Sequence, residues 1–170
     1  RADFWDAKDK RTSGTTAGAT RSDTLHSAFI RYENALAIAP VTTYIGLGRT
    51  ERFPDYWELI SAHSVGTSDS NSAFLSTKSE KTNQLDLGFL SKLDKLTLNG
   101  SVFYNQIDDF ILIDYRSGFS SMMGYGSARN INAHTYGAEL DATYKIYDEL
   151  KVNASLAYVR GSNETDHLDL

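Results

Sequence analysis

Six stretches of the chain alternate apolar with polar or small residues, and the connections between them alternate between short and long. The alternating stretches are residues 25–38, 41–50, 82–93, 95–107, 134–146 and 150–160. Short connections lie around Pro40, Asp94 and Asp148, whereas segments 51–81 and 108–133 are long. A period of two is typical of a β-strand with two different faces. In an antiparallel meander, these connections place the short turns at one edge of the sheet and the long loops at the other.

This sorting of loops by length favours a membrane barrel over a soluble sandwich. Bacterial outer-membrane barrels combine short periplasmic turns with long extracellular loops, whereas a sandwich has no reason to do so. We therefore predict an all-β fold, an antiparallel up-and-down meander that forms part of a transmembrane β-barrel. Segments 51–81 and 108–133 are then long external loops. Residues 1–24, which are rich in small and charged side chains, are expected to form another external loop.

Charged residues keep to one face of the alternating stretches. In 134–146, for example, Glu139 and Asp141 alternate with Leu140 and Tyr144. A charge facing lipid near the midplane of the membrane would cost about 2–4 kcal/mol, so this segregation suits a barrel wall. A soluble β-sandwich binding module, with the apolar face packed on a core, remains an alternative interpretation of the same periodicity.

Composition excludes several other classes of function. The 170 residues include no cysteine, so this sequence offers no disulfide framework, thiol nucleophile or thiolate metal site. A net charge of −5 without a basic cluster argues against nucleic acid as a partner. No hydrolase, metalloprotease or P-loop motif occurs, and we expect no enzyme activity and no resident cofactor. Because the chain begins at Arg1 without an initiator Met, we expect an internal piece of a longer secreted precursor.

Four ordered sequence elements resemble the carboxy-terminal barrel region of TonB-dependent outer-membrane receptors. The family's Arg-x-Pro-x-x-x-Glu-Leu type of strand end is similar to GRTERFPDYWEL at 48–59. Its "PEKS…E.G" strand opening is similar to SEKTNQLDLG at 79–88, although Ser79 and Asp86 stand where the family usually has Pro and Glu. The remaining two elements, a "F…..D.I" strand end and a "G.E" strand, are matched by FYNQIDDFI at 103–111 and YGAEL at 136–140.

Within that family, two elements look most like the branch described as copper receptors, namely Phe29–Glu33 and Glu51–Trp57. The resemblance implies a 22-stranded barrel in the bacterial outer membrane, of which this chain supplies about six to eight strands. It also implies a separate amino-terminal plug domain, absent from this chain, through which the TonB complex energises transport. The implied partners are a copper ion or metal chelate, outer-membrane lipid and lipopolysaccharide.

Two further readings of function stay open at this point. One is a receptor for a siderophore or another metal chelate. The other is a small, self-contained outer-membrane barrel of about eight strands with a structural or adhesive role, a size that 170 residues would suit.

Candidate metal ligands lie in the two longest loops. Copper prefers Met thioethers and His imidazoles, and the chain's only methionines, Met122 and Met123, sit side by side in a Gly/Ser-rich segment. His63 lies in the other long loop. We predict these three residues as copper contacts, against the alternatives that the methionines pack on a neighbouring loop and that His63 is an ordinary surface residue. For Arg49 and Arg52, the default expectation is a structural ion pair with Glu51, Asp55 or Glu58.

Overall fold

The structure, a computed structural model, describes residues 1–60, 73–114 and 127–170 and consists almost entirely of strands. Its one described helix, of five residues, is α1, and no helix in the described part of the chain is long and apolar enough to cross a membrane. The elements in chain order are β1 (Ala2–Lys8), β2 (Thr20–His26), β3 (Ala28–Ala35), β4 (Val41–Arg52), α1 (Tyr56–Ile60), β5 (Glu80–Lys92), β6 (Leu96–Asp114), β7 (Ser127–Lys145), β8 (Lys151–Asn163) and β9 (Leu168–Asp169).

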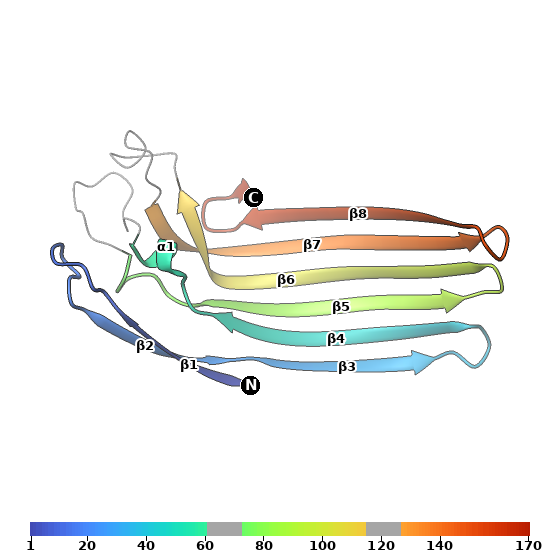
Figure 1. Ribbon diagram of the computed structural model, residues 1–170, viewed down its shortest axis with the longest axis horizontal. Helices are drawn as coiled ribbons and strands as arrows, with labels where there is room; N and C mark the ends of the chain where they lie inside the picture. Colours follow the sequence, from blue (N-terminus) through green and yellow to red (C-terminus); the bar gives the residue numbers. More distant parts are fainter. Residues whose placement is uncertain (61–72, 115–126) are drawn as a thin grey trace. The chain divides into compact units, whose positions relative to one another are not determined.

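The sheet topology is the predicted meander. Strands β3 to β9 form one sheet in chain order, and neighbouring strands from β3 to β8 run in opposite directions (Figure 1). Each of the six alternating stretches overlaps one strand from β3 to β8, although the first two residues of stretch 25–38 belong to β2. The prediction of an all-β, antiparallel up-and-down fold is therefore confirmed.

The boundaries of β6 and β7 differ most from the expectation. Strand β6 continues to Asp114 and β7 begins at Ser127, so both extend into segment 108–133, which the sequence predicts as loop. The reason is packing, because Ile111 on β6 and Ala128 on β7 are buried in one apolar cluster. Alternation alone does not reveal this, since the polar residues Asp108 and Asp109 interrupt the pattern just before it.

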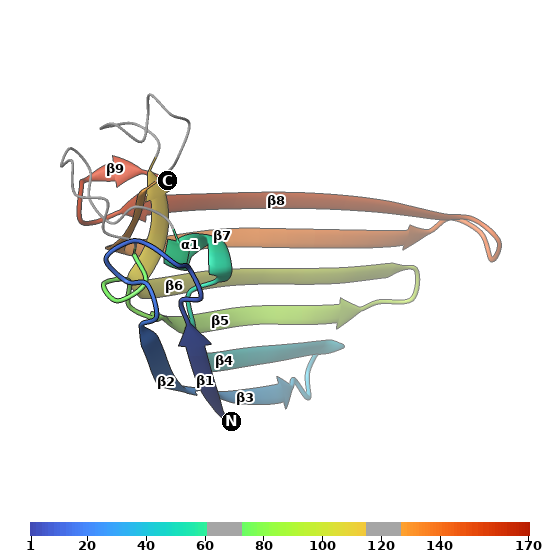
Figure 2. The same cartoon turned by 60° about the vertical axis from the view of Figure 1, so that its left-hand side comes forward.

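Residues 1–24, expected as a loop, contain most of an antiparallel hairpin. Strands β1 and β2 form a separate two-stranded sheet, visible side by side in Figure 2, in which Trp5 is opposite Asp23 and Ala7 is opposite Arg21. The segment ADFWDAK does not alternate strictly, since the adjacent apolar residues Phe4 and Trp5 fall on opposite faces of β1. The hairpin closes through the turn that follows Lys8.

The chain forms two compact units, which are described separately below. Unit 1 comprises residues 1–27, 50–82 and 107–133, and unit 2 comprises residues 28–49, 83–106 and 134–170. Unit 2 consists of strands and short turns. Unit 1 holds the hairpin, α1 and the flanks of the long loops.

In unit 2, the pairing of β3 with β4 separates an apolar face from a polar one. Ile30 lies opposite Leu47 and Tyr32 opposite Ile45, and all four side chains are exposed. On the other face, Arg31 lies opposite Gly46, and its guanidinium stacks 3.7 Å from the ring centroid of Tyr44. An apolar face this exposed is costly in water but is what a lipid-facing barrel wall requires.

A row of aromatic rings crosses the apolar face of unit 2. Tyr104 on β6 stacks on His134 of β7, His134 stacks on Tyr136, and Tyr136 contacts Tyr158 of β8. Tyr144 stands on the same face of β7, eight residues beyond Tyr136. That spacing is about 26 Å along a strand and about 20 Å along the membrane normal at a typical tilt, close to the apolar height of a membrane barrel. The two positions fit the two aromatic girdles of such a wall.

On the polar face of unit 2, one glycine allows adjacent strands to pack closely. A Cβ added to Gly137 would lie 2.6 Å from the ring of Phe103 and 2.5 Å from the carbonyl oxygen of Tyr158. Only glycine leaves room there for the Phe103 ring to lie across β7.

Candidate functional site

The candidate site lies in unit 1, where a small apolar cluster holds the hairpin and α1 together. Its buried members are Leu25 of β2, Phe53, Leu59 of α1 and Phe74, with Ala7 and Ala19 packed against them. The Trp5 ring stacks parallel to Phe53, with 5.8 Å between centroids and 6° between planes. The guanidinium of Arg21 covers the Phe53 ring at 4.9 Å. Phe53 is thus in contact with both strands of the hairpin.

Helix α1 starts where it does because of a capping box. Asp55 Oδ1 accepts a hydrogen bond from the Glu58 backbone N–H at 2.9 Å, and Glu58 Oε2 accepts one from the Asp55 backbone N–H at 2.7 Å. This reciprocal arrangement satisfies two amides that would otherwise lack partners at the helix start. Pro54 just before it disfavours helix at Phe53. The helix thereby keeps Leu59 buried in the apolar cluster.

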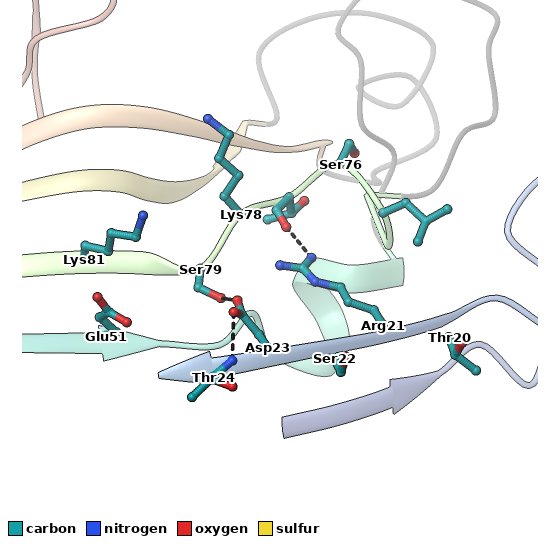
Figure 3. Close-up of a pocket in the computed structure, with 12 residues that line it drawn as sticks. Thr20, Arg21, Ser22, Asp23, Thr24, Glu51, Ser76, Lys78, Ser79 and Lys81 are labelled. Carbon is teal, nitrogen blue, oxygen red and sulfur yellow. Dashed lines mark hydrogen bonds between the residues drawn. The ribbon is translucent and has the colours of Figure 1, made fainter. Parts of the chain in front are cut away.

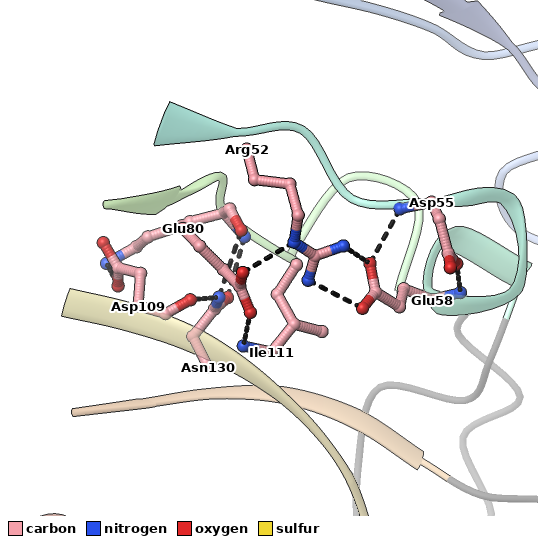
Figure 4. A network of polar contacts seen from close by, with 8 residues as sticks. Arg52, Asp55, Glu58, Glu80, Asp109, Ile111 and Asn130 are labelled. Atoms are coloured by element: carbon pink, nitrogen blue, oxygen red, sulfur yellow. Dashed lines mark hydrogen bonds and ion pairs between the residues drawn. The ribbon is translucent and has the colours of Figure 1, made fainter. Parts of the chain in front are cut away.

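Arg52 joins α1 to two strands (Figure 4). It donates to both oxygens of Glu58, each at 2.9 Å, and through Nε to Glu80 Oε2 at 2.6 Å. The other oxygen of Glu80 accepts the Ile111 backbone N–H of β6 at 2.7 Å. Both carboxylates are nearly buried, whereas the Arg52 side chain stays 45% exposed. The expected pairing of Arg52 with Glu58 is confirmed, and Glu80 is an additional partner.

Residues 73–79 are tied to the hairpin and to β7 by polar contacts. Arg21 donates to the carbonyl oxygens of Phe74 and Thr77. Asp23 accepts from the Ser79 hydroxyl, as Figure 3 shows. The Asn130 side chain accepts from the Lys78 backbone N–H at 2.7 Å. Arg21, Asp23 and Ser79 border a cavity of about 590 Å³. The contacts fix the chain that follows segment 61–72.

Asn130 also holds an unusual backbone conformation. Asp109 in β6 has a φ of 57°, in the left-handed region that non-glycine residues seldom occupy. Asn130 Nδ2 donates to the Asp109 carbonyl oxygen at 2.6 Å, and Lys78 Nζ lies 3.3 Å from its carboxylate. Aspartate tolerates this conformation better than most residues. The contacts of Asn130 and Lys78 stabilise Asp109 where its backbone departs from regular strand geometry.

A second apolar cluster lies at the flanks of both long loops. Ala73, Ile111 and Ala128 are buried together, with Ile113 packed against them. Ala73 directly follows segment 61–72, whereas Ile111 and Ala128 precede and follow segment 115–126. The described residue after segment 61–72 therefore shares one cluster with residues on both sides of segment 115–126.

The hairpin turn carries its own ion pair. Asp9, 5% exposed, accepts hydrogen bonds from Arg11 Nη2 at 2.6 Å and from the Thr16 hydroxyl at 2.8 Å. The hydrogen bonds from the Arg11 side chain and backbone hold the pKa of Asp9 well below its usual range, with Thr16 adding to the effect. The turn is thus closed around a carboxylate that stays ionised at neutral pH.

Comparison with known proteins identifies this architecture. The family model described as "TonB dependent receptor-like, beta-barrel" matches residues 1–169. The chain belongs to the TonB-dependent receptor β-barrel family. As part of such a receptor, it is located in the bacterial outer membrane. The exposed apolar face of unit 2 is then the face toward lipid.

A solved structure gives a closer comparison for this TonB-dependent receptor segment. The structure, titled "Copper transporter OprC", shares 44% sequence identity with the chain at a TM-score of 0.87. The match covers 99% of this chain but only 27% of that transporter. No curated protein sequence matches the chain.

The family's signature residues, as predicted from the sequence, converge in the receptor's unit 1. Arg52 and Glu58 come from the predicted strand-end element, Glu80 from the strand opening, and Ile111 from the next strand end. The sequence did not indicate that Glu80 would bind both Arg52 and the Ile111 amide, because these partners are far apart along the chain. The capping spacing from Asp55 to Glu58, after a proline, was a local signal for α1.

The three predicted copper contacts, His63, Met122 and Met123, lie outside the described residues. Among the described residues, no three His, Asp or Glu side chains gather as a metal site. His134 pairs with Glu164 at 2.9 Å. The hydrogen bond with His134, and then that with Gln106, lowers the pKa of Glu164.

Proposed function

We propose that this chain is part of an outer-membrane receptor that takes up copper, with transport energised through TonB. The observation that carries the proposal is the match to a copper transporter, with 44% identity over 99% of this chain. Because the chain spans 27% of that transporter, the plug domain and the contact with TonB would belong to other parts of the protein. Outer-membrane lipid and lipopolysaccharide would surround the apolar face.

We further propose His63, Met122 and Met123 as copper contacts in the external loops. Imidazole and thioether groups are ligands that copper prefers. The burial of Ala73 with Ile111 and Ala128 supports the idea, since residues that follow the His63 segment and residues on both sides of the Met122 and Met123 segment share one cluster. The Arg52 network supports it as well, because it fixes α1, which precedes the His63 segment.

Copper uptake by whole cells tests the proposal. The full-length parent receptor is expressed in a Gram-negative host, and cell-associated copper is measured by mass spectrometry at limiting external copper. We expect receptor-dependent accumulation that disappears in a host without TonB. Accumulation that is equal with and without the receptor would refute copper uptake, and accumulation that persists without TonB would refute the energy coupling.

A further inference from the structure

A cavity beside β2 in unit 1 has no role in the copper proposal. It is the cavity that Arg21, Asp23 and Ser79 border (Figure 3), and we call it the β2 cavity. Its volume of about 590 Å³ is within the range of about 300–1,000 Å³ typical of small-molecule sites. Residues of β2, Glu51 near the end of β4, and residues that precede or begin β5 form its lining.

The β2 cavity carries more positive than negative charge. Three cations and two carboxylates give its lining a net charge of +1, namely Arg21, Lys78 and Lys81 with Asp23 and Glu51. Both oxygens of Asp23 already accept hydrogen bonds, from the Ser79 hydroxyl and from the Thr24 backbone N–H. Glu51 accepts the His26 backbone N–H at 3.0 Å. Because the carboxylates are engaged by the chain itself, the cavity complements an anion better than a cation.

The charge of Arg21 is only partly compensated by the protein. Its Nη1 donates to the carbonyl oxygens of Phe74 and Thr77, and the guanidinium covers the Phe53 ring. Its Nε and Nη2 have no hydrogen-bond partner among the described residues. Burial lowers the pKa of Arg21 more than the charge of Asp23 raises it. A partly buried guanidinium with spare donors favours a bound anion, and its planar fork matches the oxygens of a phosphate group.

Lys81 supplies a second cation to the same cavity. It makes no hydrogen bond or ion pair within the part of the chain that the structure describes. Lys78, by contrast, lies 3.3 Å from the Asp109 carboxylate. We therefore assign the charge available to an anion to Arg21 and Lys81.

Half of the residues that line the β2 cavity carry hydroxyl groups. They are Thr20, Ser22, Thr24, Ser76, Thr77 and Ser79. Thr77 is only 1% exposed, and its hydroxyl has no hydrogen-bond partner among the described residues. A buried hydroxyl without a partner is unfavourable, and a ligand rich in hydroxyl groups can supply the missing bond. Because hydroxyls both donate and accept, this lining suits a sugar.

Charge and hydroxyls together define the class of ligand. No aromatic residue belongs to the described lining, so a neutral sugar has no ring there on which to stack. A phosphate on the sugar provides the charge that Arg21 and Lys81 complement. We propose that the β2 cavity binds a phosphorylated sugar, with these two cations on the phosphate and the hydroxyl side chains on the sugar. The inference is independent of copper uptake.

Two sources of this chemistry reach the outer side of the membrane, where the long loops of a receptor barrel lie. One is the phosphorylated core of lipopolysaccharide, and the other is soluble sugar phosphate. Both present the same groups to the cavity, so the probes have to distinguish them.

Binding to the full-length receptor tests the inference. The receptor is refolded into detergent from inclusion bodies, so that no lipopolysaccharide occupies the cavity beforehand, and affinities are measured by isothermal titration calorimetry. We expect glucose 6-phosphate to bind at least about tenfold more tightly than glucose or inorganic phosphate. Equal affinity for glucose, or for inorganic phosphate, would overturn the inference.

A further probe, the phosphorylated core oligosaccharide of lipopolysaccharide, separates the two sources. If it binds more tightly than glucose 6-phosphate, lipopolysaccharide is the source. If it binds more weakly, a soluble sugar phosphate is the ligand. Both orders support the β2 cavity as a site for phosphorylated sugar.

Matched variants locate the binding. We expect Arg21→Gln and Lys81→Gln each to raise the dissociation constant of glucose 6-phosphate about tenfold. Thr77→Val keeps the shape of the side chain and removes the unpaired hydroxyl, so it should raise the constant about fivefold without lowering the unfolding temperature. Lys10→Gln, which removes an exposed cation of the same hairpin outside this lining, should leave binding unchanged.

Lys81→Gln and Thr77→Val are the decisive variants. Arg21 also holds the chain at Phe74 and Thr77, so Arg21→Gln is compared only if it folds, as judged by heat-modifiable gel migration. The side chains of Lys81 and Thr77 make no hydrogen bond within the described residues, so their replacement should leave the fold intact. Unchanged affinity in both Lys81→Gln and Thr77→Val would overturn the inference.

Discussion

Arg52 and Glu58 form a two-pronged ion pair, with both guanidinium-to-carboxylate contacts at 2.9 Å. Because Arg52 ends β4 and Glu58 lies in α1, the pair fixes the direction in which the chain leaves the strand. Glu80 adds a third contact to the same guanidinium and brings in β5. One half-exposed arginine therefore links the end of β4 to α1 and to the start of β5.

Replacing Arg52 should destabilise the receptor. In Arg52→Ala, two nearly buried carboxylates lose their cation, which we expect to cost about 2 kcal/mol, less than a fully buried pair because Arg52 is half exposed. Thermal unfolding of the full-length receptor in detergent, followed by circular dichroism, measures the loss. Lys145→Ala serves as control, since its pair with Asp148 is exposed and should contribute about 0.5 kcal/mol or less. Equal effects of the two substitutions would contradict the role of Arg52.

The assignment of faces in unit 2 predicts a contrast between neighbours. Leu156 is 70% exposed on the apolar face of β8, so Leu156→Arg should cost about 2–4 kcal/mol against lipid. Ser155 lies on the polar face and bonds Asp141, so Ser155→Arg should be tolerated. The effect of each substitution is measured as the fraction of receptor that assembles in the outer membrane, which is seen as the heat-modifiable gel band. If Leu156→Arg assembled better than Ser155→Arg, the assignment of the lipid-facing and polar faces would be wrong.

Position 137 should not tolerate even the methyl side chain of alanine. The added Cβ of Gly137→Ala would collide with the Phe103 ring and the Tyr158 carbonyl oxygen, at a cost of about 1–3 kcal/mol in detergent unfolding. Adding Phe103→Leu should recover part of this loss, because it removes one of the two obstacles. Strictly additive effects of the two substitutions would show that the ring is not the obstacle.

The hairpin turn should open in acid. The folded pKa of Asp9 is lowered, so its contribution to stability is complete above about pH 4, the usual aspartate pKa, and is lost as the pH falls toward the lowered value. Hydrogen exchange of residues 9–19, corrected for intrinsic rates, should show protection at pH 5 that declines below pH 3. Asp9→Asn should abolish this pH dependence. Protection that is independent of pH in the unsubstituted receptor would contradict the account.

Local periodicity explains why the sequence predicts the strands so well. Alternating side chains such as those around Leu140 identify each strand and its lipid face without any knowledge of distant residues. The contacts that build unit 1 are different in kind. Glu80 with Ile111 and Asn130 with Lys78 join segments 31 and 52 residues apart, and no local pattern specifies such partners.

Two further features depended on packing. The extension of β6 to Asp114 follows from the burial of Ile111 against Ala128, which alternation does not reveal. The contact between the hairpin and α1 depends on the burial of Leu25 with Leu59, which are distant in sequence. The predicted copper contacts His63, Met122 and Met123 remain predictions, because they lie outside the described residues.

Metal content of the full-length receptor tests the central claim most directly. The receptor is purified from outer membranes after copper exposure, and copper per protein is measured by mass spectrometry in the unsubstituted form and in Met122→Ala/Met123→Ala. The account predicts near-stoichiometric copper in the first and a clear loss in the second. Copper retained in the double variant would contradict the proposed ligands, and no copper in either would contradict a copper receptor.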